Sequence, residues 1–208
     1  MNLCVIIPAY NEQEDLPRVL ADIPRAIPGI DSLKVVVIND GSTDLTSDYA
    51  YRFGADVVVN FKCNRGLAAA FEAGLNTALG LGADIIVNLD ADYQYLPSEI
   101  PQLIAPILRG EADMVIGDRQ TRRVKEFSWV KRCLQNLGSD IVRRLAKIDT
   151  PIDAVSGFRA LTADAALRLN LVTSFSYATE TIIQARQKGL AVASVPVTRN
   201  HTARKSRL

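Results

Sequence analysis

Short apolar segments alternate with segments of helical periodicity along the first part of this chain, and this alternation restricts the possible folds more than any other feature. Buried strands that alternate with helices of about ten to fifteen residues imply right-handed crossover connections and a mostly parallel sheet. The sequence therefore predicts an α/β fold in which helices flank a mostly parallel central sheet. The apolar runs that we interpret as strands are Leu3–Ile7, Lys34–Ile38, Asp56–Asn60, Ile85–Asp90 and Asp113–Gly117.

The second part of the chain continues the pattern. Phe127–Lys147 has the periodicity of a long helix, and Pro151–Arg159 is predicted to be a loop that runs into a strand. Two more helices, at Thr162–Leu169 and Ala178–Lys188, and a last strand at Leu190–Val197 complete the expected elements. A chain of 208 residues with 48% hydrophobic residues suits a single domain. We therefore expect one domain without an internal repeat.

Each predicted strand of the first part ends in polar or glycine residues. In parallel sheets, ligands bind beyond the carboxyl ends of the strands. We therefore expect these ends to meet at one edge of the sheet and to form the binding site there. The segments concerned are Tyr10–Glu12, Asp40, Asn64–Gly66, Asp90–Asp92 and Gly117–Arg119.

Two carboxylates and one amide follow the fourth predicted strand, at Asp90, Asp92 and Gln94. Two neighbouring carboxylates repel each other, and a bound cation relieves that repulsion. Mg²⁺ and Mn²⁺ prefer oxygen ligands and keep coordination positions open for phosphates. The alternative is that both aspartates only form a turn and cap the helix that follows.

The near-neutral net charge of the chain conceals two halves of opposite sign. Residues 1–118 contain 7 Lys and Arg against 17 Asp and Glu, whereas residues 119–208 contain 17 against 6. An acidic half with a cation site and a basic half that holds anions indicate substrates that carry phosphate. Two solvated surfaces of opposite charge are the alternative explanation.

Six short motifs stand along the chain: Pro8–Glu12, Asn39–Asp44, Asn64–Gly66, Asp90–Asp92, Gly117–Arg119 and Ser156–Arg159. They occur in the order found in family 2 glycosyltransferases, and the chain most closely resembles the dolichol- or polyprenyl-phosphate sugar synthases of that family. The resemblance implies a glycosyltransferase A-type, Rossmann-like fold, a nucleotide-sugar donor and Mg²⁺ or Mn²⁺ as cofactor. It also implies a single catalytic domain with a nucleotide-binding half, 1–118, and an acceptor-binding half, 119–208, that ends in a basic tail.

The resemblance further implies roles for individual residues on the donor side. The expected metal ligands are Asp90, Asp92 and Gln94, with Asp90, Ala91 and Asp92 also close to the ribose and diphosphate. Asp40 is expected to read the edge of the base. The residues expected to line the nucleotide pocket are Pro8, Ala9, Tyr10 and Glu12.

Three residues of the second half receive roles in the same way. Arg119 is expected to bind the diphosphate, since a guanidinium can bind two oxygens at once. Asp153 matches an aspartate placed near the acceptor, and Arg159 is expected to hold an acceptor or donor phosphate. Asn39 departs from the family pattern, in which an aspartate is common at this position. A Gln-x-x-Arg-Trp motif is absent from the sequence, which argues against a processive polysaccharide synthase.

The implied reaction is an inverting sugar transfer in which the metal, with Arg119, stabilises the departing diphosphate. With a polyprenyl or dolichyl phosphate as acceptor, little proton removal is needed. With a hydroxyl acceptor, as in surface polysaccharide or glycolipid synthesis, Asp153 becomes the candidate general base. Asp92, Asp153 and Arg119 are thus the expected catalytic residues. The donor is a GDP- or UDP-sugar, and the sequence leaves the sugar and base open.

The basic second half favours the lipid-phosphate acceptor, because clusters of Lys and Arg are attracted to anionic membrane surfaces. We expect a cytoplasmic protein at the cytoplasmic face of the membrane, without a nucleic-acid partner. A sugar-nucleotide pyrophosphorylase is disfavoured because Pro8–Glu12 lacks a glycine-rich phosphate loop with a lysine. A flavodoxin-like binding module would not require the motifs between Arg119 and Arg159.

Overall fold

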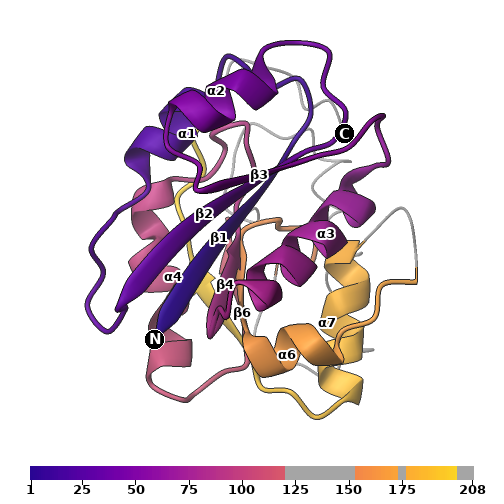
Figure 1. Ribbon diagram of the computed structural model, residues 1–208. Helices are drawn as coiled ribbons and strands as arrows, with labels where there is room; N and C mark the ends of the chain where they lie inside the picture. The colour runs from indigo at the N-terminus through magenta and orange to yellow at the C-terminus, as the bar shows by residue number, and fades with distance from the viewer. Residues whose placement is uncertain (120–152, 173–176, 201–208) are drawn as a thin grey trace, which may run out of the picture.

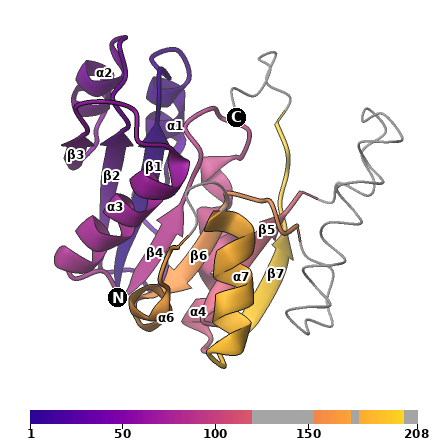
Figure 2. The same cartoon turned by 90° about the vertical axis from the view of Figure 1, so that its right-hand side faces the viewer.

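The computed structural model describes residues 1–119, 153–172 and 177–200. Within these residues, seven strands form one sheet in the order β3-β2-β1-β4-β6-β5-β7 (Figure 1 and Figure 2). The strands are β1 (Asn2–Ala9), β2 (Ser32–Asn39), β3 (Val57–Asn60), β4 (Ile85–Asn88), β5 (Met114–Asp118), β6 (Arg159–Thr162) and β7 (Val192–Pro196).

Helices cover both faces of the sheet. Alternate residues of β1 explain this arrangement, since Leu3, Val5 and Ile7 pack in one core with α1 and α4, whereas Cys4 and Ile6 pack in a second core with α3, α6 and α7. Figure 2 shows α3, α6 and α7 on the face of the sheet that is turned toward the viewer. The helices are α1 (Leu16–Asp22), α2 (Thr46–Arg52), α3 (Leu67–Gly80), α4 (Ile100–Leu108), α6 (Ala163–Arg168) and α7 (Tyr177–Gln187), with a 3-10 turn, η1 (Pro97–Glu99), before α4.

The sheet is mostly parallel, as the sequence predicts. β1 pairs in parallel with β2 and β4, β2 with β3, and β5 with β7. β6 is the exception, because it runs antiparallel to both β4 and β5. Its first residue, Arg159, therefore pairs with Asn88 at the carboxyl end of β4. This reversal brings the loop before β6 to the edge of the sheet where the parallel strands end.

The predicted elements of the described residues are present, with shifts of a few residues at their ends. Two sequence predictions, the long helix Phe127–Lys147 and the basic tail after Asn200, lie outside the described residues. Among residues 1–119, 153–172 and 177–200, none of the helices combines the length and the apolar character that are needed to cross a membrane.

Candidate active site

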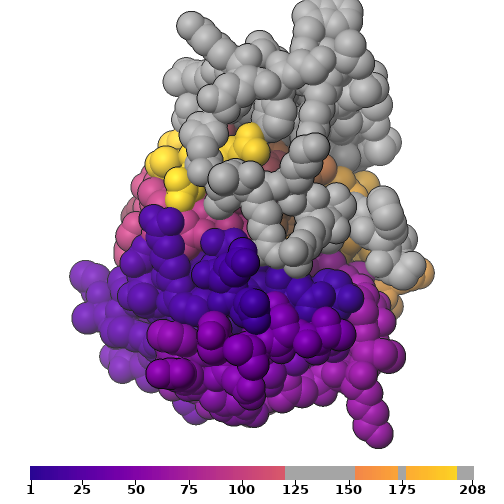
Figure 3. All heavy atoms as spheres, turned by 90° about the horizontal axis from the view of Figure 1, so that it is seen from above, coloured from indigo at the N-terminus to yellow at the C-terminus, as the bar shows by residue number. Residues whose placement is uncertain are grey.

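A cavity of about 300 Å³ lies at the carboxyl edge of the sheet. Figure 3 looks down onto this edge, where the N-terminal residues, in indigo, form a band across the described surface. The ends of β1, β2 and β4 and the start of α3 meet at the cavity, as expected for a parallel sheet. Its lining consists of Pro8, Ala9, Tyr10, Glu12, Asp40, Asn64, Gly66, Leu67, Ala70, Asp90, Ala91 and Asp92.

All residues of 1–118 that the sequence assigns to the nucleotide, the diphosphate or the metal line this cavity, with the exception of Gln94. Gln94, Arg119, Asp153 and Arg159 are not among the lining residues. Leu67 and Ala70, from the first turns of α3, line the cavity although the sequence assigns them no role. Their position directly after Asn64–Gly66 is the one signal that would have found them.

The loop after β1 is held by the loop after β2. The backbone N–H of Asn11 donates to Ser42 Oγ at 2.9 Å, and that of Glu12 donates to Thr46 Oγ1 at 2.8 Å. Asn11 has a positive φ of 54° and accepts, through its side-chain oxygen, a hydrogen bond from the backbone N–H of Thr43 at 2.8 Å. Ser42 and Thr43 of the second motif and Thr46 at the start of α2 therefore shape the first wall of the cavity.

Asp40 is buried and accepts two backbone hydrogen bonds, from Arg65 N–H at 2.7 Å and from Gly66 N–H at 2.9 Å. Each carboxylate oxygen keeps a second lone pair, so the predicted contact with the base remains compatible with these bonds. Gly41 allows the loop to approach, because an added Cβ would lie 2.3 Å from the carbonyl carbon of Cys63 and its φ is +69°.

Two side-chain hydrogen bonds explain why an asparagine suits position 39. Its side-chain amide donates to Asn60 Oδ1 at 2.9 Å, and its side-chain oxygen accepts from the backbone N–H of Ser42 at 3.1 Å. A carboxylate at this position can accept but cannot donate to the amide oxygen of Asn60. The departure from the family pattern is therefore matched by Asn60 on β3.

Asp90 and Asp92 line the same cavity just beyond β4. Burial, followed by repulsion from Asp92, raises the pKa of Asp90 to about 7, although the charges of Arg119 and Arg159 act in the opposite direction. Asp92 Oδ1 accepts a hydrogen bond from the backbone N–H of Gln94 at 3.1 Å. The carboxyl pair is therefore costly to keep ionised in the absence of a cation.

Gly157 supports Asp90 from the side of β6. A Cβ added at Gly157 would lie 2.4 Å from Oδ1 and 2.6 Å from Oδ2 of Asp90, so a side chain there would displace the carboxylate or the loop. The carbonyl oxygen of Gly157 accepts a hydrogen bond from Asn88 Nδ2 at 2.7 Å. The sequence predicts no role for either Gly157 or Asn88. The position of Gly157 inside the Ser156–Arg159 motif is a signal that could have found it, whereas no sequence signal marks Asn88.

The cost of the buried charge leads to a prediction about stability. In the metal-free protein, Asp90→Asn is expected to raise the melting temperature by at least about 3 °C at pH 8. Because the pKa of Asp90 is raised from 3.8 to about 7, the native protein binds more protons than the unfolded chain between these values, and its stability falls as the pH rises through them. The gain of the variant should therefore be complete above about pH 7 and absent near pH 4. Thermal unfolding of both proteins across this range measures it, and equal melting temperatures at pH 8 would contradict it.

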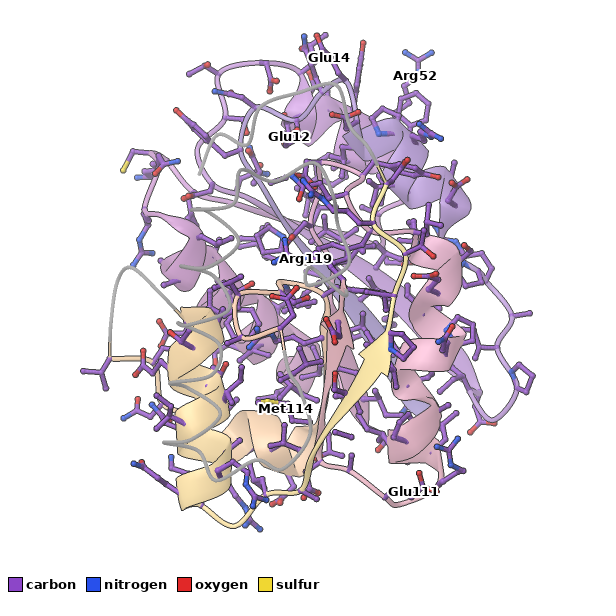
Figure 4. All side chains as sticks on the ribbon, turned by 180° about the vertical axis from the view of Figure 1, so that it is seen from behind. Glu12, Glu14, Arg52, Glu111, Met114 and Arg119 are labelled. Atoms are coloured by element: carbon purple, nitrogen blue, oxygen red, sulfur yellow. The ribbon has the colours of Figure 1, made fainter. Side chains whose placement is uncertain are left out.

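Arg119 and Asp153 form a bidentate ion pair at the same edge of the sheet. Arg119 Nε lies 2.6 Å from Asp153 Oδ2, and Nη2 lies 3.0 Å from Oδ1. The side chains are 13% and 2% exposed. Figure 4, the view from behind, shows Arg119 near the middle of the molecule, below Glu12 and above Met114 at the start of β5. The structure thus joins the two predicted residues to each other, an arrangement that the sequence does not predict.

Arg159 is 0% exposed and lies beneath the site. Its guanidinium donates to the carbonyl oxygen of Ser156, to the carbonyl oxygen of Ala178 at 2.9 Å and to Thr181 Oγ1 at 2.8 Å. These bonds fasten the loop that carries Gly157 to α7. Its full burial and these bonds indicate a structural role, and its contact with a phosphate stays a prediction.

The donor set suits a hard divalent cation. Two carboxylates reach the cavity, and a side-chain amide follows two residues later. No group of three or more His, Cys, Asp or Glu side chains that could hold a metal occurs in the part of the chain that the structure describes. Mg²⁺ is commonly bound by one or two carboxylates together with substrate phosphates and water rather than by an all-protein cage. The pair Asp90 and Asp92 fits that mode of binding.

Known proteins resemble this chain over most of its length. A family model described as Glycosyl transferase family 2 matches residues 4–168. The chain is 30% identical over 207 residues to an undecaprenyl-phosphate mannosyltransferase of Micrococcus luteus, an alignment that covers 95% of this chain and 83% of that protein. It is also 30% identical over 205 residues to a polyprenol monophosphomannose synthase of Mycolicibacterium smegmatis, with 93% of this chain and 76% of that protein covered.

A solved structure with a similar fold is glucosyl-3-phosphoglycerate synthase from Mycobacterium tuberculosis in complex with Mn²⁺, UDP-glucose and phosphoglyceric acid. It matches with a TM-score of 0.76 and 25% identity over 98% of this chain and 72% of that chain. The same enzyme with Mn²⁺, UDP and glucosyl-3-phosphoglycerate also matches with a TM-score of 0.76. These matches confirm the predicted glycosyltransferase A-type fold.

Proposed function

We propose that this chain, which belongs to glycosyl transferase family 2, moves a sugar from a nucleotide-sugar donor to a polyprenyl phosphate with Mg²⁺ or Mn²⁺ as cofactor. The chain is a glycosyltransferase, and the donor, the acceptor and the metal are the proposal. The observation that carries it is the presence of Asp90 and Asp92 in one cavity with the ends of β1 and β2. The relatives named undecaprenyl-phosphate mannosyltransferase and polyprenol monophosphomannose synthase support the choice of acceptor.

The nucleoside is proposed to bind between the loop after β1 and the start of α3. Asp40 would accept a hydrogen bond from the base with the lone pairs that Arg65 and Gly66 leave free. Tyr10, whose side chain is partly exposed beside the cavity, offers a flat face to the base. The solved relative that binds UDP-glucose supports a uridine donor, and the mannosyltransferase relatives leave the base open.

The cation would be held by Asp90 and Asp92, with Gln94 as a further ligand. Bound there, it would supply Lewis-acid stabilisation of the charge that develops on the departing diphosphate. Arg119 would add a second positive group. A guanidinium has five N–H donors, and the pair with Asp153 uses those at Nε and Nη2. Within the described residues the other donors make no hydrogen bond, and they would bind a phosphate oxygen.

The pairing of Asp153 bears on the choice between the two acceptor classes. A general base must reach the proton that it removes. Asp153 is almost completely buried, and both of its oxygens accept hydrogen bonds from Arg119. This arrangement disfavours proton abstraction from a hydroxyl acceptor. It suits a phosphate acceptor, which arrives as an anion and is attracted by the neighbouring guanidinium.

The Asp153→Asn variant separates these two acceptors. With polyprenyl phosphate we expect kcat to fall by less than about tenfold, because no proton needs to be removed. Loss of a general base would instead lower kcat by about 10²–10⁴-fold. Steady-state rates at saturating donor, with the melting temperature of the variant as a check on folding, measure the difference. A fall of more than about 100-fold in a folded variant would contradict the view that Asp153 removes no proton and only pairs with Arg119.

The function itself is tested by incubating the protein with Mn²⁺, polyprenyl phosphate and radiolabelled GDP-mannose or UDP-glucose. Transfer moves the label into an organic-solvent extract. We expect label in that extract only when the lipid phosphate and a divalent cation are both present. Label that stays in water with every donor, or that moves to a free polyprenol as readily as to its phosphate, would contradict the proposal.

An anionic membrane surface on the cytoplasmic side is proposed as the place of action. A polyprenyl acceptor is held in the bilayer, so the enzyme must reach that surface. The excess of 17 Lys and Arg over 6 Asp and Glu in residues 119–208 supports electrostatic attraction to it.

A further inference from the structure

Tyr93, between Asp92 and Gln94, has an unusual backbone conformation. Its φ is +57°, in the left-handed region that a residue with a side chain adopts only at a cost in free energy. Its side chain is buried, with an exposed fraction of 4%. The resulting turn is closed by the bond from the backbone N–H of Gln94 to Asp92 Oδ1. A strained turn persists when the surrounding structure holds it, and the contacts of Tyr93 show what holds this one.

The side chain of Tyr93 is anchored on α1. Its hydroxyl donates a hydrogen bond to Asp22 Oδ2, and the guanidinium carbon of Arg18 lies 3.9 Å from the centre of its ring. Arg18 and Asp22 are four residues apart on the helix, so both face the same side. The tyrosine is thus held by a charged acceptor at its tip and by a cation over its face.

The helix α1, which anchors Tyr93, also begins directly after the loop that forms another wall of the cavity. The backbone N–H of Leu16, the first residue of α1, donates to the carbonyl oxygen of Glu12 at 3.0 Å. Glu12 lines the cavity together with Asp92. α1 therefore connects the loop after β1 to the turn after β4, which fixes two walls of the site relative to each other.

We propose that Tyr93 is a positioning residue that holds the Asp92–Gln94 turn against α1 and thereby sets the affinity of the site for a divalent cation. This inference rests on the proposed function, in which Asp92 and Gln94 are metal ligands. Tyr93 itself does not touch the cation. It acts by keeping the ligands in the conformation that binds, since ligands held in advance lose less freedom on binding.

The test compares Mn²⁺ affinity among variants, measured from the electron paramagnetic resonance signal of free Mn²⁺, first with the metal alone and then with UDP or GDP. Tyr93→Phe keeps the ring and its contact with Arg18 but removes the hydroxyl. Asp22→Ala removes the acceptor, whereas Asp22→Asn keeps an oxygen that can accept the same hydrogen bond. Ile107→Val is the matched control, because it removes buried volume from the same core without touching the turn.

We expect Tyr93→Phe and Asp22→Ala each to weaken Mn²⁺ binding by about tenfold, the size usual for groups that orient metal ligands. The double variant should be no weaker than either single variant, because both remove the same bond. Asp22→Asn and Ile107→Val should stay within about twofold of the unchanged protein, a pattern that a purely structural role for Tyr93 would not produce.

The remaining outcomes count against the inference. Unchanged affinity in Tyr93→Phe and Asp22→Ala, additive losses in the double variant, or an equal loss in Ile107→Val would overturn it while leaving the proposed function intact. Failure of the unchanged protein to bind Mn²⁺ with or without nucleotide would overturn the proposed metal site and the inference together.

Discussion

The Asp92→Asn variant is expected to lose sugar transfer by at least about 100-fold. Asp92 lines the cavity beside Asp90 and, in the proposed function, is a charged ligand of the cation. An amide keeps the size of the side chain and an oxygen for Gln94 N–H, but it removes one negative charge. Loss of a group that stabilises developing charge through a preorganised site typically costs about 10²–10³-fold in rate. Rates measured with polyprenyl phosphate at several Mn²⁺ concentrations quantify the loss.

Asp48→Asn is the control for this variant. It makes the same change of charge on the exposed side of α2, away from the residues that line the cavity. Its rate should lie within about twofold of that of the unchanged protein, since the charge of an exposed side chain outside the cavity is screened by salt. If Asp92→Asn transferred sugar as fast as Asp48→Asn, Asp92 would be a turn residue and not a part of the machinery.

Gly157→Ala is expected to reduce transfer by about 10–100-fold through Asp90. The added methyl group would lie 2.4 Å from Oδ1 of Asp90, closer than any non-bonded carbon and oxygen can approach, so the carboxylate or the loop must move. Insertion of a methyl group into a packed region also destabilises by about 1–3 kcal/mol. Transfer rate, Mn²⁺ affinity and melting temperature should therefore all decrease.

Gly80→Ala is the control that separates an effect on Asp90 from a general effect of replacing glycine by alanine. Gly80 lies in α3, and a Cβ added there would meet nothing within 4 Å. Alanine is favoured over glycine in helices, so this variant should keep its rate and match or exceed the original stability. A Gly157→Ala protein that retained full activity and Mn²⁺ affinity would show that Asp90 does not need the space that Gly157 leaves.

Much of the fold follows from the sequence because local pattern and global arrangement agree in the first half. Apolar runs such as Lys34–Ile38 and Ile85–Asp90 are short, rich in β-branched residues and separated by helical segments, so a parallel sheet is the one arrangement that fits them. The direction of β6 did not follow in this way. Arg159–Thr162 has no pattern that distinguishes a parallel from an antiparallel strand, and its direction depends on long-range pairing with β4 and β5.

The residues of the candidate site likewise differ in whether the sequence could predict their positions. Residues in loops that directly follow parallel strands, such as Glu12, Asp40 and Asp90, could be grouped from the sequence because the sheet carries them to one edge. The pairing of Arg119 with Asp153 joins residues 34 positions apart, and it depends on how the loop before β6 packs. Burial of Arg159 likewise depends on α7, which lies well beyond it in the chain. Spacing alone carries no information about such contacts.

A crystal structure of the protein soaked with Mn²⁺ and UDP or GDP tests the central claim most directly, because manganese is located by its anomalous scattering. We predict one strong manganese peak at the carboxyl end of β4, in coordination contact with Asp90 or Asp92 and with the diphosphate of the nucleotide. A nucleotide bound in the cavity without manganese between it and these two carboxylates, or manganese bound at another position of the molecule, would contradict the account.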